Sequence, residues 1–217
     1  MDWNEALVGE LLHKWDRLLV MLRGARPIVV PRWYGQITQR AQLIGFCDAS
    51  AKAYAAVVYV RLETKAGVDS RFVAAKTRVA PVGGTTIPRM ELLSALLLSK
   101  LVSSIEEAWQ SRLQLEHPIC YTDSKATLYW IQGTKHMWKQ FVENRVTTIR
   151  GLVDPQHWKH CPGVENPADI PSRGMAASAL AENPLWLEAL FGSKPRISRL
   201  TSLLVVRLQC LNIAVQR

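Results

Sequence analysis

The hydrophobic positions at the start of the chain fall on one side of a helix. In residues 3–22 (WNEALVGELLHKWDRLLVML) large apolar side chains recur at helical spacing. They are Leu7, Leu11, Trp15, Leu18, Leu19 and Leu22. Gly24 predicts the end of this helix, and ARPIVVPRW (25–33), which contains two prolines, predicts an extended connector. We expect a docking helix that has no chemistry of its own.

Three short runs of strand-forming residues follow the connector. They are QLIGFCDAS (42–50), AYAAVVYVRLE (53–63) and SRFVAAKTRV (70–79), with turn signals between them that include AGVDS (66–70). This pattern predicts an antiparallel meander. After a loop with Pro81, Gly83 and Gly84, Pro88 opens the predicted helix PRMELLSALLLSKLVSSIEEAW (88–109), because proline suits a first helical turn.

The second half of the chain alternates short strand and helix patterns. HPICYT (117–122) predicts a buried strand, and SKATLYWIQG (124–133) and HMWKQFVENRVTTIRGLV (136–153) predict helices. QHWKHCP (156–162) predicts a last strand and ENPADIPSRG (165–174) a final helix start. The resulting order predicts an α/β fold, a mixed sheet covered by helices. Residues 193–217 fit either the start of a further domain or a packing extension.

Composition narrows the class of partner. The chain has 217 residues, 48% of them hydrophobic, which is enough for one domain with flanking pieces. Its 27 basic and 18 acidic residues give a net charge of +9, which suits a polyanion such as nucleic acid or an anionic membrane surface. Charge alone does not separate these two partners.

Cysteine spacing and hydropathy predict the compartment. The cysteines Cys47, Cys120, Cys161 and Cys210 form no C-x-x-C pair, so we expect neither a zinc site nor a redox pair, and a reducing compartment. No signal peptide is visible, and the apolar stretch 200–215 is interrupted by polar residues and too short to span a bilayer. We therefore expect a soluble protein that is not secreted and has no membrane partner.

Four acidic residues lie where predicted elements begin or end: Asp48, Glu91, Asp123 and Asp169. Each has an ordinary alternative explanation, as a turn residue, a helix cap or a first-turn acid. Glu91 is harder to explain in this way, because Ala95, Leu98 and Val102 place it on the helix face that should pack on the sheet. A carboxylate in that position needs a partner.

Together the four acids predict one metal site. Active sites of α/β sheets gather at the carboxyl ends of strands and at the helix starts beside them. Four carboxylates brought together there would repel one another, so divalent cations are the natural compensation. Ligation by oxygen alone favours magnesium or manganese over zinc.

The order of these acids resembles a known family. The strand-end Asp, the helix-borne Glu, TDS (122–124) and NPAD (166–169) resemble the D-E-D-D order of ribonuclease H, and HCPGVENPAD (160–169) resembles its His-loop-Asn-x-x-x-Asp ending. Five motifs resemble more closely the ribonuclease H region of Pol polyproteins from Bel/Pao-type retrotransposons. They are GFCDAS with AYAAVVYVR, AAKTRVAP, TIPRMELLSALLLSKL, YTDSKATLYWIQG with WKQFVENRV, and WKHCPGVENPADIPSRG.

This resemblance implies a fold and a domain organisation. The expected fold is a ribonuclease H-like mixed five-stranded sheet, with its first three strands antiparallel, flanked by helices. It would occupy residues 41–178. Residues 1–40 would be the helix and connector that follow a reverse transcriptase not included in this chain, and residues 179–217 an unassigned C-terminal extension.

The resemblance also implies the chemistry and its setting. It predicts two-metal hydrolysis of the RNA strand of an RNA–DNA hybrid, with two Mg²⁺ ions that Mn²⁺ can replace. Asp48 would bridge both ions, with Glu91 and Asp123 on one and Asp169 on the other. The expected partners are the hybrid, the reverse transcriptase and the other Pol domains. The expected location is the cytoplasm, within a virus-like particle of an intact element, or the nucleus.

Further residues are candidates for catalysis and substrate binding. His160 matches the loop histidine that the resemblance links to proton transfer and product departure; the alternative is an ordinary strand-end histidine. Lys135, Trp138, Lys139 and Arg145 suit contacts with the hybrid backbone, the alternative being a solvated helix face with Trp138 in the core. Ser50, Arg89 and Ser124 flank the acids and are predicted to touch phosphate or a 2′-hydroxyl.

Three alternative interpretations of the sequence compete with a nuclease. The chain fits a catalytically silent retroelement fragment or a host-adopted module that binds nucleic acid without cutting it. An integrase or transposase core would carry two Asp and then a late Glu, and here the Glu comes second. A structural connection domain would not need a complete carboxylate set.

Overall fold

The computed structural model describes residues 5–25, 40–64, 67–134, 138–181, 183, 185 and 186, and the predicted order of elements is confirmed in it. The strands are β1 (Arg40–Ala49), β2 (Ala53–Thr64), β3 (Gly67–Val79), β4 (Leu115–Thr122) and β5 (Trp158–His160). The helices are α1 (Gly9–Arg23), α2 (Ile87–Trp109), α3 (Lys125–Gln132), α4 (Gln140–Leu152), α5 (Asp169–Arg173) and α6 (Ala177–Ala181), with short 3₁₀ turns η1 (Pro155–His157) and η2 (Gly163–Glu165).

The five strands form one mixed sheet in the order β3-β2-β1-β4-β5. The first three strands are antiparallel neighbours, whereas β4 runs parallel to β1 and β5 runs parallel to β4. The predicted fold class is therefore confirmed. Because β1, β4 and β5 are parallel, their carboxyl ends meet at the same edge of the sheet.

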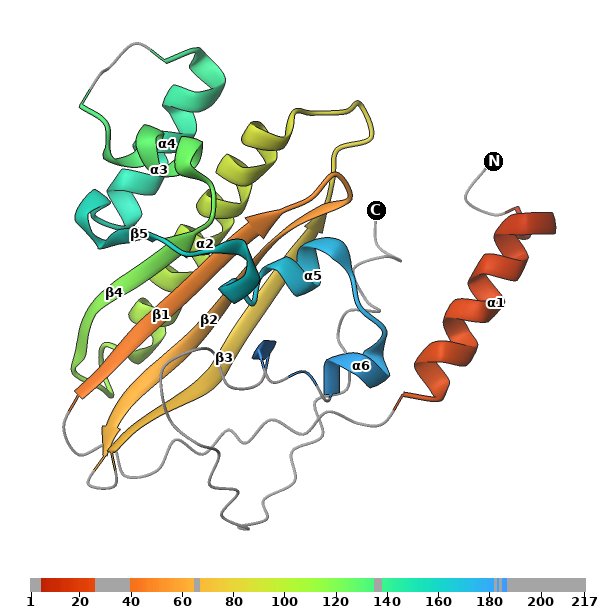
Figure 1. The fold of residues 1–217 in the computed structure, drawn as a ribbon, viewed down its shortest axis with the longest axis horizontal. Coiled ribbons are helices and arrows are strands. Elements are labelled where there is room, and N and C mark those ends of the chain that lie inside the picture. Colours follow the sequence, from red (N-terminus) through yellow and green to blue (C-terminus); the bar gives the residue numbers. More distant parts are fainter. Residues whose placement is uncertain are drawn as a thin grey trace.

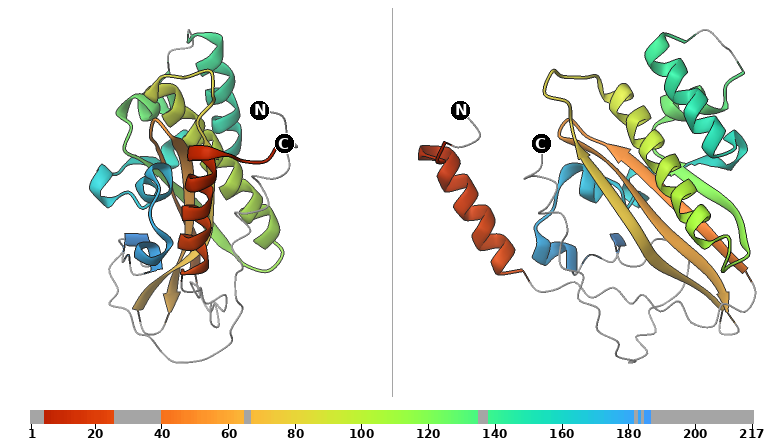
Figure 2. Two further views of the ribbon diagram at one scale, coloured as in Figure 1. Left: turned by 90° about the vertical axis from the view of Figure 1, so that its right-hand side faces the viewer. Right: turned by 180° about the vertical axis from the view of Figure 1, so that it is seen from behind.

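Helices cover the two faces of the sheet unequally (Figures 1 and 2). The long helix α2 packs on β1 and β2, with Leu92, Ala95, Leu98 and Val102 completely buried, and α3 and α4 pack beside it. The short helix α5 contacts β1 and β2 from the opposite face, where Ile44, Phe46 and Tyr59 form a second core cluster. Because β1 and β2 are buried on both faces of the sheet, their sequences are nearly continuous runs of apolar residues.

Some element boundaries differ from the sequence prediction. The first helix begins at Gly9 rather than at residue 3, with Gly9 in the left-handed region (φ +60°) that glycine adopts without strain. The segment AGVDS is mostly strand, because β3 already begins at Gly67. The fourth helix begins at Gln140, so Trp138 and Lys139 precede it. Residues 193–217 lie outside the described residues.

The helix α1 stands apart from the sheet in Figure 1. None of its fifteen residues is buried, and the stripe predicted for docking is open, with Leu11, Trp15 and Leu18 among the exposed large apolar residues. Among the described residues, no helix is both long enough and apolar enough to span a bilayer.

The close packing of α2 on β1 gives a test of the fold. A Cβ atom at Gly45 would lie 2.6 Å from Cδ1 and 3.2 Å from Cγ of the buried Leu98. Gly45→Ala should therefore lower the free energy of unfolding by about 1–3 kcal/mol, measured by urea denaturation. The matched control is Gly151→Ala in α4, where a Cβ meets nothing within 4 Å; it should raise stability by about 0.5–1 kcal/mol. Equal effects at both sites would contradict this packing.

Candidate active site

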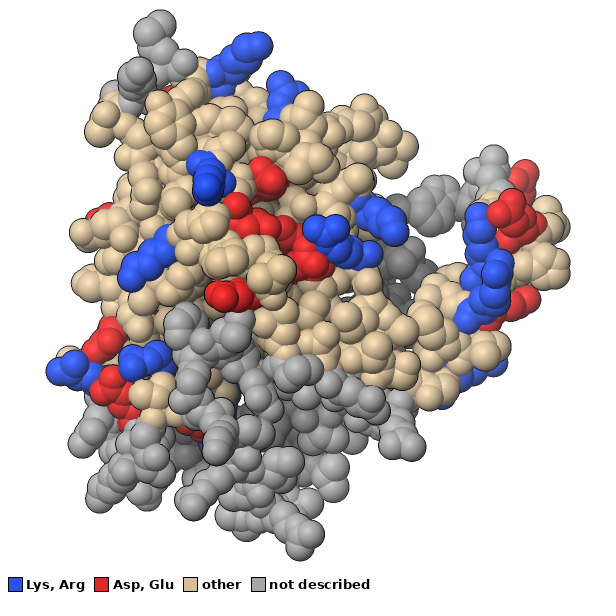
Figure 3. All heavy atoms as spheres, viewed as in Figure 1, with Lys and Arg blue, Asp and Glu red and all other residues tan. Residues whose placement is uncertain are grey.

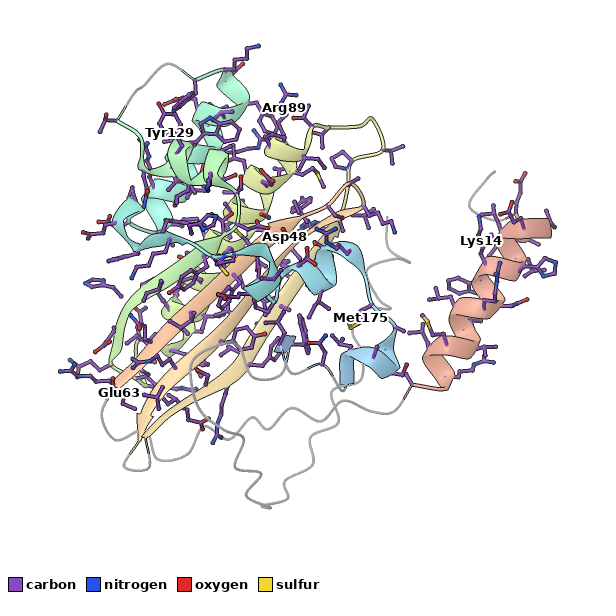
Figure 4. All side chains as sticks on the ribbon, viewed as in Figure 1. Lys14, Asp48, Glu63, Arg89, Tyr129 and Met175 are labelled. Carbon is purple, nitrogen blue, oxygen red and sulfur yellow. The ribbon has the colours of Figure 1, made fainter. Side chains whose placement is uncertain are left out.

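The parallel register of β1 and β4 brings two aspartates together. Cys47 in β1 lies opposite Thr122 in β4, and each is followed at once by an aspartate, Asp48 or Asp123. Asp48 is buried, with 4% of its surface exposed, and Asp123 is half-buried. Figure 4 labels Asp48 near the end of β1, close to α5. Both residues therefore stand where the sequence predicted strand-end acids.

Two helices add the other two acids. Glu91 lies near the start of α2 and accepts a hydrogen bond of 2.6 Å at Oε2 from the hydroxyl of Ser124, the residue that caps α3 directly after Asp123. Asp169 is the first residue of α5, which contacts β1 and β2. The four predicted acids therefore converge from four separate elements. Acidic side chains form a patch near the middle of this face, with basic side chains around it (Figure 3).

The electrostatics confirm that the acids act on one another. Burial and, to a smaller extent, the charges of Asp123 and Asp169 together raise the pKa of Asp48 from 3.8 to about 6, although the hydrogen bond from Ser172 opposes the shift. Burial also raises the pKa of Asp123, helped by Glu91 and Asp169 and opposed by a side-chain hydrogen bond with Asp48. Half-buried carboxylates that repel one another favour the bound proton or a bound cation.

Donors of the chain itself hold three of the carboxylates. Ser124 donates to Glu91, the buried Ser172 donates to Oδ2 of Asp48, and Arg173 pairs through Nε with Oδ1 of Asp169. Ser172 and Arg173 both belong to α5, so this short helix contributes one acid and the donors to two. Ser50 donates to the main-chain oxygen of Ser172 at 2.6 Å and so ties α5 to the turn after β1.

The donor set fits a hard divalent cation by its chemistry. All four groups offer carboxylate oxygens, the ligands that magnesium and manganese prefer. Burial raises the pKa of the neighbouring Cys47 thiol to about 12, so it stays protonated and is a poor ligand. Among the described residues, no three acid, imidazole or thiol side chains are already arranged as a cation site.

The loop before α5 approaches the acids with its backbone. A Cβ at Gly163 would lie 3.2 Å from Oδ2 of Asp123, so a side chain here would push the Asp123 carboxylate aside by a few tenths of an ångström. The buried Asn166 donates to the main-chain oxygen of Cys47 at 3.0 Å and accepts from the amide of Ala168, which fixes the loop against β1. His160 ends β5 opposite Thr122 and is exposed, and β4 lies between it and the strand of Asp48.

The two serines predicted to touch substrate, Ser50 and Ser124, already form hydrogen bonds within the protein. Ser50 accepts from the amides of Lys52 and Ala53 besides donating to Ser172, and Ser124 both caps α3 and orients Glu91. Their hydroxyls therefore position parts of the site.

Three of the other predicted substrate residues, Arg89, Trp138 and Lys139, line a groove beside the start of α2. The groove has a volume of about 350 Å³ and is lined in part by Arg89, Trp130, Trp138, Lys139 and Phe141. The Arg89 guanidinium lies 4.8 Å from the centre of the Phe141 ring.

Arg145 differs from this set because it is held by its own helix. Its guanidinium stacks on Phe141 at 3.5 Å and donates to the main-chain oxygen of Phe141 at 2.9 Å. Lys135 lies outside the described residues.

The sequence did not single out Ser172, Arg173 or Gly163, and it gave Asn166 only as the asparagine of the His-loop-Asn-x-x-x-Asp ending. All four follow His160 within one short segment, and three of them lie in the run NPADIPSRG. Arg173 pairs with Asp169 at the i, i+4 spacing of a helix, which the sequence could have signalled. Ser172 and Asp48, by contrast, and likewise Asn166 and Cys47, are more than a hundred positions apart. No spacing rule signals such a pair.

Comparison with known proteins gives one family match. Residues 1–124 match the family model described as Pao retrotransposon-like RNaseH-like domain. No curated protein matches the sequence. The family match includes Asp48, Glu91 and Asp123, whereas Asp169 lies beyond it.

Solved structures similar to this chain include three from different sources. The N-terminal RNase H domain of a Mycobacterium tuberculosis protein, fused to maltose binding protein, is 15% identical with a TM-score of 0.44, covering 65% of this chain and 96% of that chain. RNase H1 from Halobacterium salinarum NRC-1 is 13% identical (TM-score 0.38; 60% and 91% covered). The foamy viral protease-reverse transcriptase in complex with RNA/DNA hybrid is 16% identical (TM-score 0.39; 71% and 19% covered).

The raised pKa of Asp48 predicts a pH-dependent stability. Between its ordinary pKa of 3.8 and about 6, the folded protein holds a proton that the unfolded chain releases, so stability should fall as pH rises through this window. In EDTA, Asp48→Asn should therefore be more stable than the wild type at pH 8, by about 1 kcal/mol after allowance for solvent screening. The free energies of unfolding of the wild type and of Asp48→Asn should become equal near pH 4. Urea denaturation at both pH values measures this, and a difference that does not change with pH would contradict the assignment.

Proposed function

The chain belongs to the Pao retrotransposon-like RNaseH-like domain family, and we propose that it is a metal-dependent endonuclease that hydrolyses the RNA strand of RNA–DNA hybrids during retrotransposon reverse transcription. The membership confirms the resemblance drawn from the sequence motifs. The observation that carries the proposal is the convergence of Asp48, Glu91, Asp123 and Asp169 at one edge of the sheet. A binding or connection domain has no need to gather four acids against their mutual repulsion.

The proposed cofactor is a pair of magnesium ions, which manganese would replace. Asp48, Glu91, Asp123 and Asp169 would hold these ions, with Asp48 proposed to serve both. Bound there, such ions would activate a water and stabilise the leaving 3′ oxygen of the RNA strand.

The residues of the chain orient the site for this chemistry. Ser172 fixes one oxygen of Asp48, and Ser124 fixes one oxygen of Glu91. Asn166 holds the loop that leads to Asp169. These contacts reduce the motion that would otherwise have to be lost when substrate binds, which is how positioning accelerates a reaction. His160, exposed at the end of β5 with β4 between it and Asp48, is proposed to assist proton transfer and product departure.

The proposed substrate surface extends from the acids to the groove beside α2. Arg89 and Lys139 supply positive charge for a phosphate backbone, and Trp138 supplies an aromatic face. Lys135 and Arg145 are proposed as further contacts of the hybrid, whereas Ser50 and Ser124, whose hydroxyls are engaged within the protein, are proposed to position the site. The net charge of +9 would assist the approach of the hybrid.

The proposed setting is a Pol polyprotein, in which a reverse transcriptase and other Pol domains would accompany this domain. The site would then act on the hybrid that reverse transcription produces, in the cytoplasm within a virus-like particle of an intact element, or in the nucleus.

Cleavage of an end-labelled RNA–DNA hybrid tests the proposed reaction. The wild type should cut the RNA strand with Mg²⁺ or Mn²⁺ and lose activity in EDTA. Asp48→Asn should lower the cleavage rate by about a hundredfold or more, because it removes a ligand charge that the reaction needs.

The matched control is Asp69→Asn, the same chemical change in an aspartate that pairs with Arg71 toward the opposite end of the sheet; it should keep activity. A folded chain that binds the hybrid but never cuts it would contradict the nuclease and support the silent-fragment or binding-module alternative.

The groove predicts a separate effect on substrate affinity. Lys139→Gln should weaken hybrid binding several-fold and reduce the slope of log affinity against log salt by about one, because one phosphate contact is lost. Fluorescence anisotropy with a labelled hybrid at several NaCl concentrations measures both quantities. Lys100→Gln, an exposed lysine farther along α2, is the control for general loss of charge. If both variants shift affinity equally, the groove does not bind the hybrid.

A further inference from the structure

One cation lies at the rim of the acidic cluster. Arg173 is the last residue of α5 and pairs through its Nε with Oδ1 of Asp169, one helical turn earlier. Its side chain is two-thirds exposed. The guanidinium therefore engages a carboxylate oxygen of the proposed cation site.

We propose that Arg173 is a built-in counter-ion that a divalent cation must displace from Asp169, and that the displaced guanidinium then binds a phosphate of the nucleic acid strand. This inference rests on the proposed function and adds a positioning and substrate-binding residue to it.

The pair can be exchanged because it is weak. An exposed ion pair one helical turn apart changes an equilibrium constant by only about twofold to fivefold, since water screens both charges. A doubly charged cation shared by several carboxylates interacts far more strongly with Asp169 than a single guanidinium does. The ion pair between Arg173 and Asp169 is thus strong enough to reduce repulsion in the cation-free chain and weak enough for a divalent cation to displace Arg173.

The helix can stay in place while Arg173 moves. The adjacent Ser172 is completely buried, holds Asp48 through its hydroxyl, and accepts from Ser50 through its main-chain oxygen. These contacts anchor the backbone of α5. The Arg173 side chain can therefore change partners by rotation about its own bonds without displacing Asp169.

The chemistry of guanidinium identifies the second partner. Its planar set of N–H donors matches two oxygens of a phosphate, and its charge remains at every pH at which the protein is folded. Because Arg173 lies at the solvent-facing rim of the acids, a nucleic acid strand placed over them would bring a phosphate within its reach.

Metal binding without nucleic acid tests the first step. The concentration of free Mn²⁺ is followed by electron paramagnetic resonance as the full chain is titrated. Arg173→Gln should bind Mn²⁺ at least about threefold more tightly than the wild type, because the competing charge is gone. Arg71→Gln, which removes the same charge from the distant pair with Asp69, is the control and should bind as the wild type does.

A double-mutant cycle shows whether Arg173 acts through Asp169. The gain from Arg173→Gln should vanish in an Asp169→Asn background, because the carboxylate under competition is absent. At saturating Mg²⁺, Arg173→Gln should also raise the KM for the hybrid several-fold while kcat changes little. An unchanged KM would overturn the phosphate contact.

The outcomes separate this inference from the proposed function. If the wild type binds Mn²⁺, Asp48→Asn loses that binding and Arg173→Gln matches Arg71→Gln, the counter-ion role is overturned and the metal site stands. If no variant binds Mn²⁺, the proposed metal-dependent function fails, and this inference fails with it.

Discussion

The register between the parallel strands β1 and β4 brings two aspartates together, and the rest of the site has to offset their repulsion. It places Asp48 beside Asp123 at the edge of the sheet, where burial weakens solvation and each negative charge opposes the other. Glu91 and Asp169 increase this repulsion. The surrounding donors keep the four acids together despite this repulsion.

The short helix α5 carries much of that task. It provides Asp169, the buried donor to Asp48 and the exposed cation that pairs with Asp169. The two donors differ in their exposure to solvent. Ser172 is sealed in the core and is suited to permanent positioning, whereas Arg173 is exposed and is suited to exchange. Neighbouring residues in one helix thus combine a fixed and a replaceable contact.

The family match and the structure contribute different parts of the conclusion. The match ends at residue 124, so it includes the first three acids and not α5. The contacts of α5 with β1 and β2, and of Ser172 with Asp48, connect the fourth acid to the matched region. The exposed helix α1 lies within the match, although no described contact gives it a role in the site.

Local patterns in the sequence determined the order of elements, the mixed sheet and the four acids at element ends, because apolar periodicity and cap residues act over a few positions. They also explained why Glu91 needs a partner, since its helical face is set by near neighbours. Only the tertiary structure decided that Ser172 holds Asp48, that Ser50 and Ser124 face inward, and that Arg145 stacks on Phe141. Except for the Arg145 stack within α4, these outcomes depend on how elements distant in sequence pack together, and side-chain directions follow from that packing rather than from spacing along the chain.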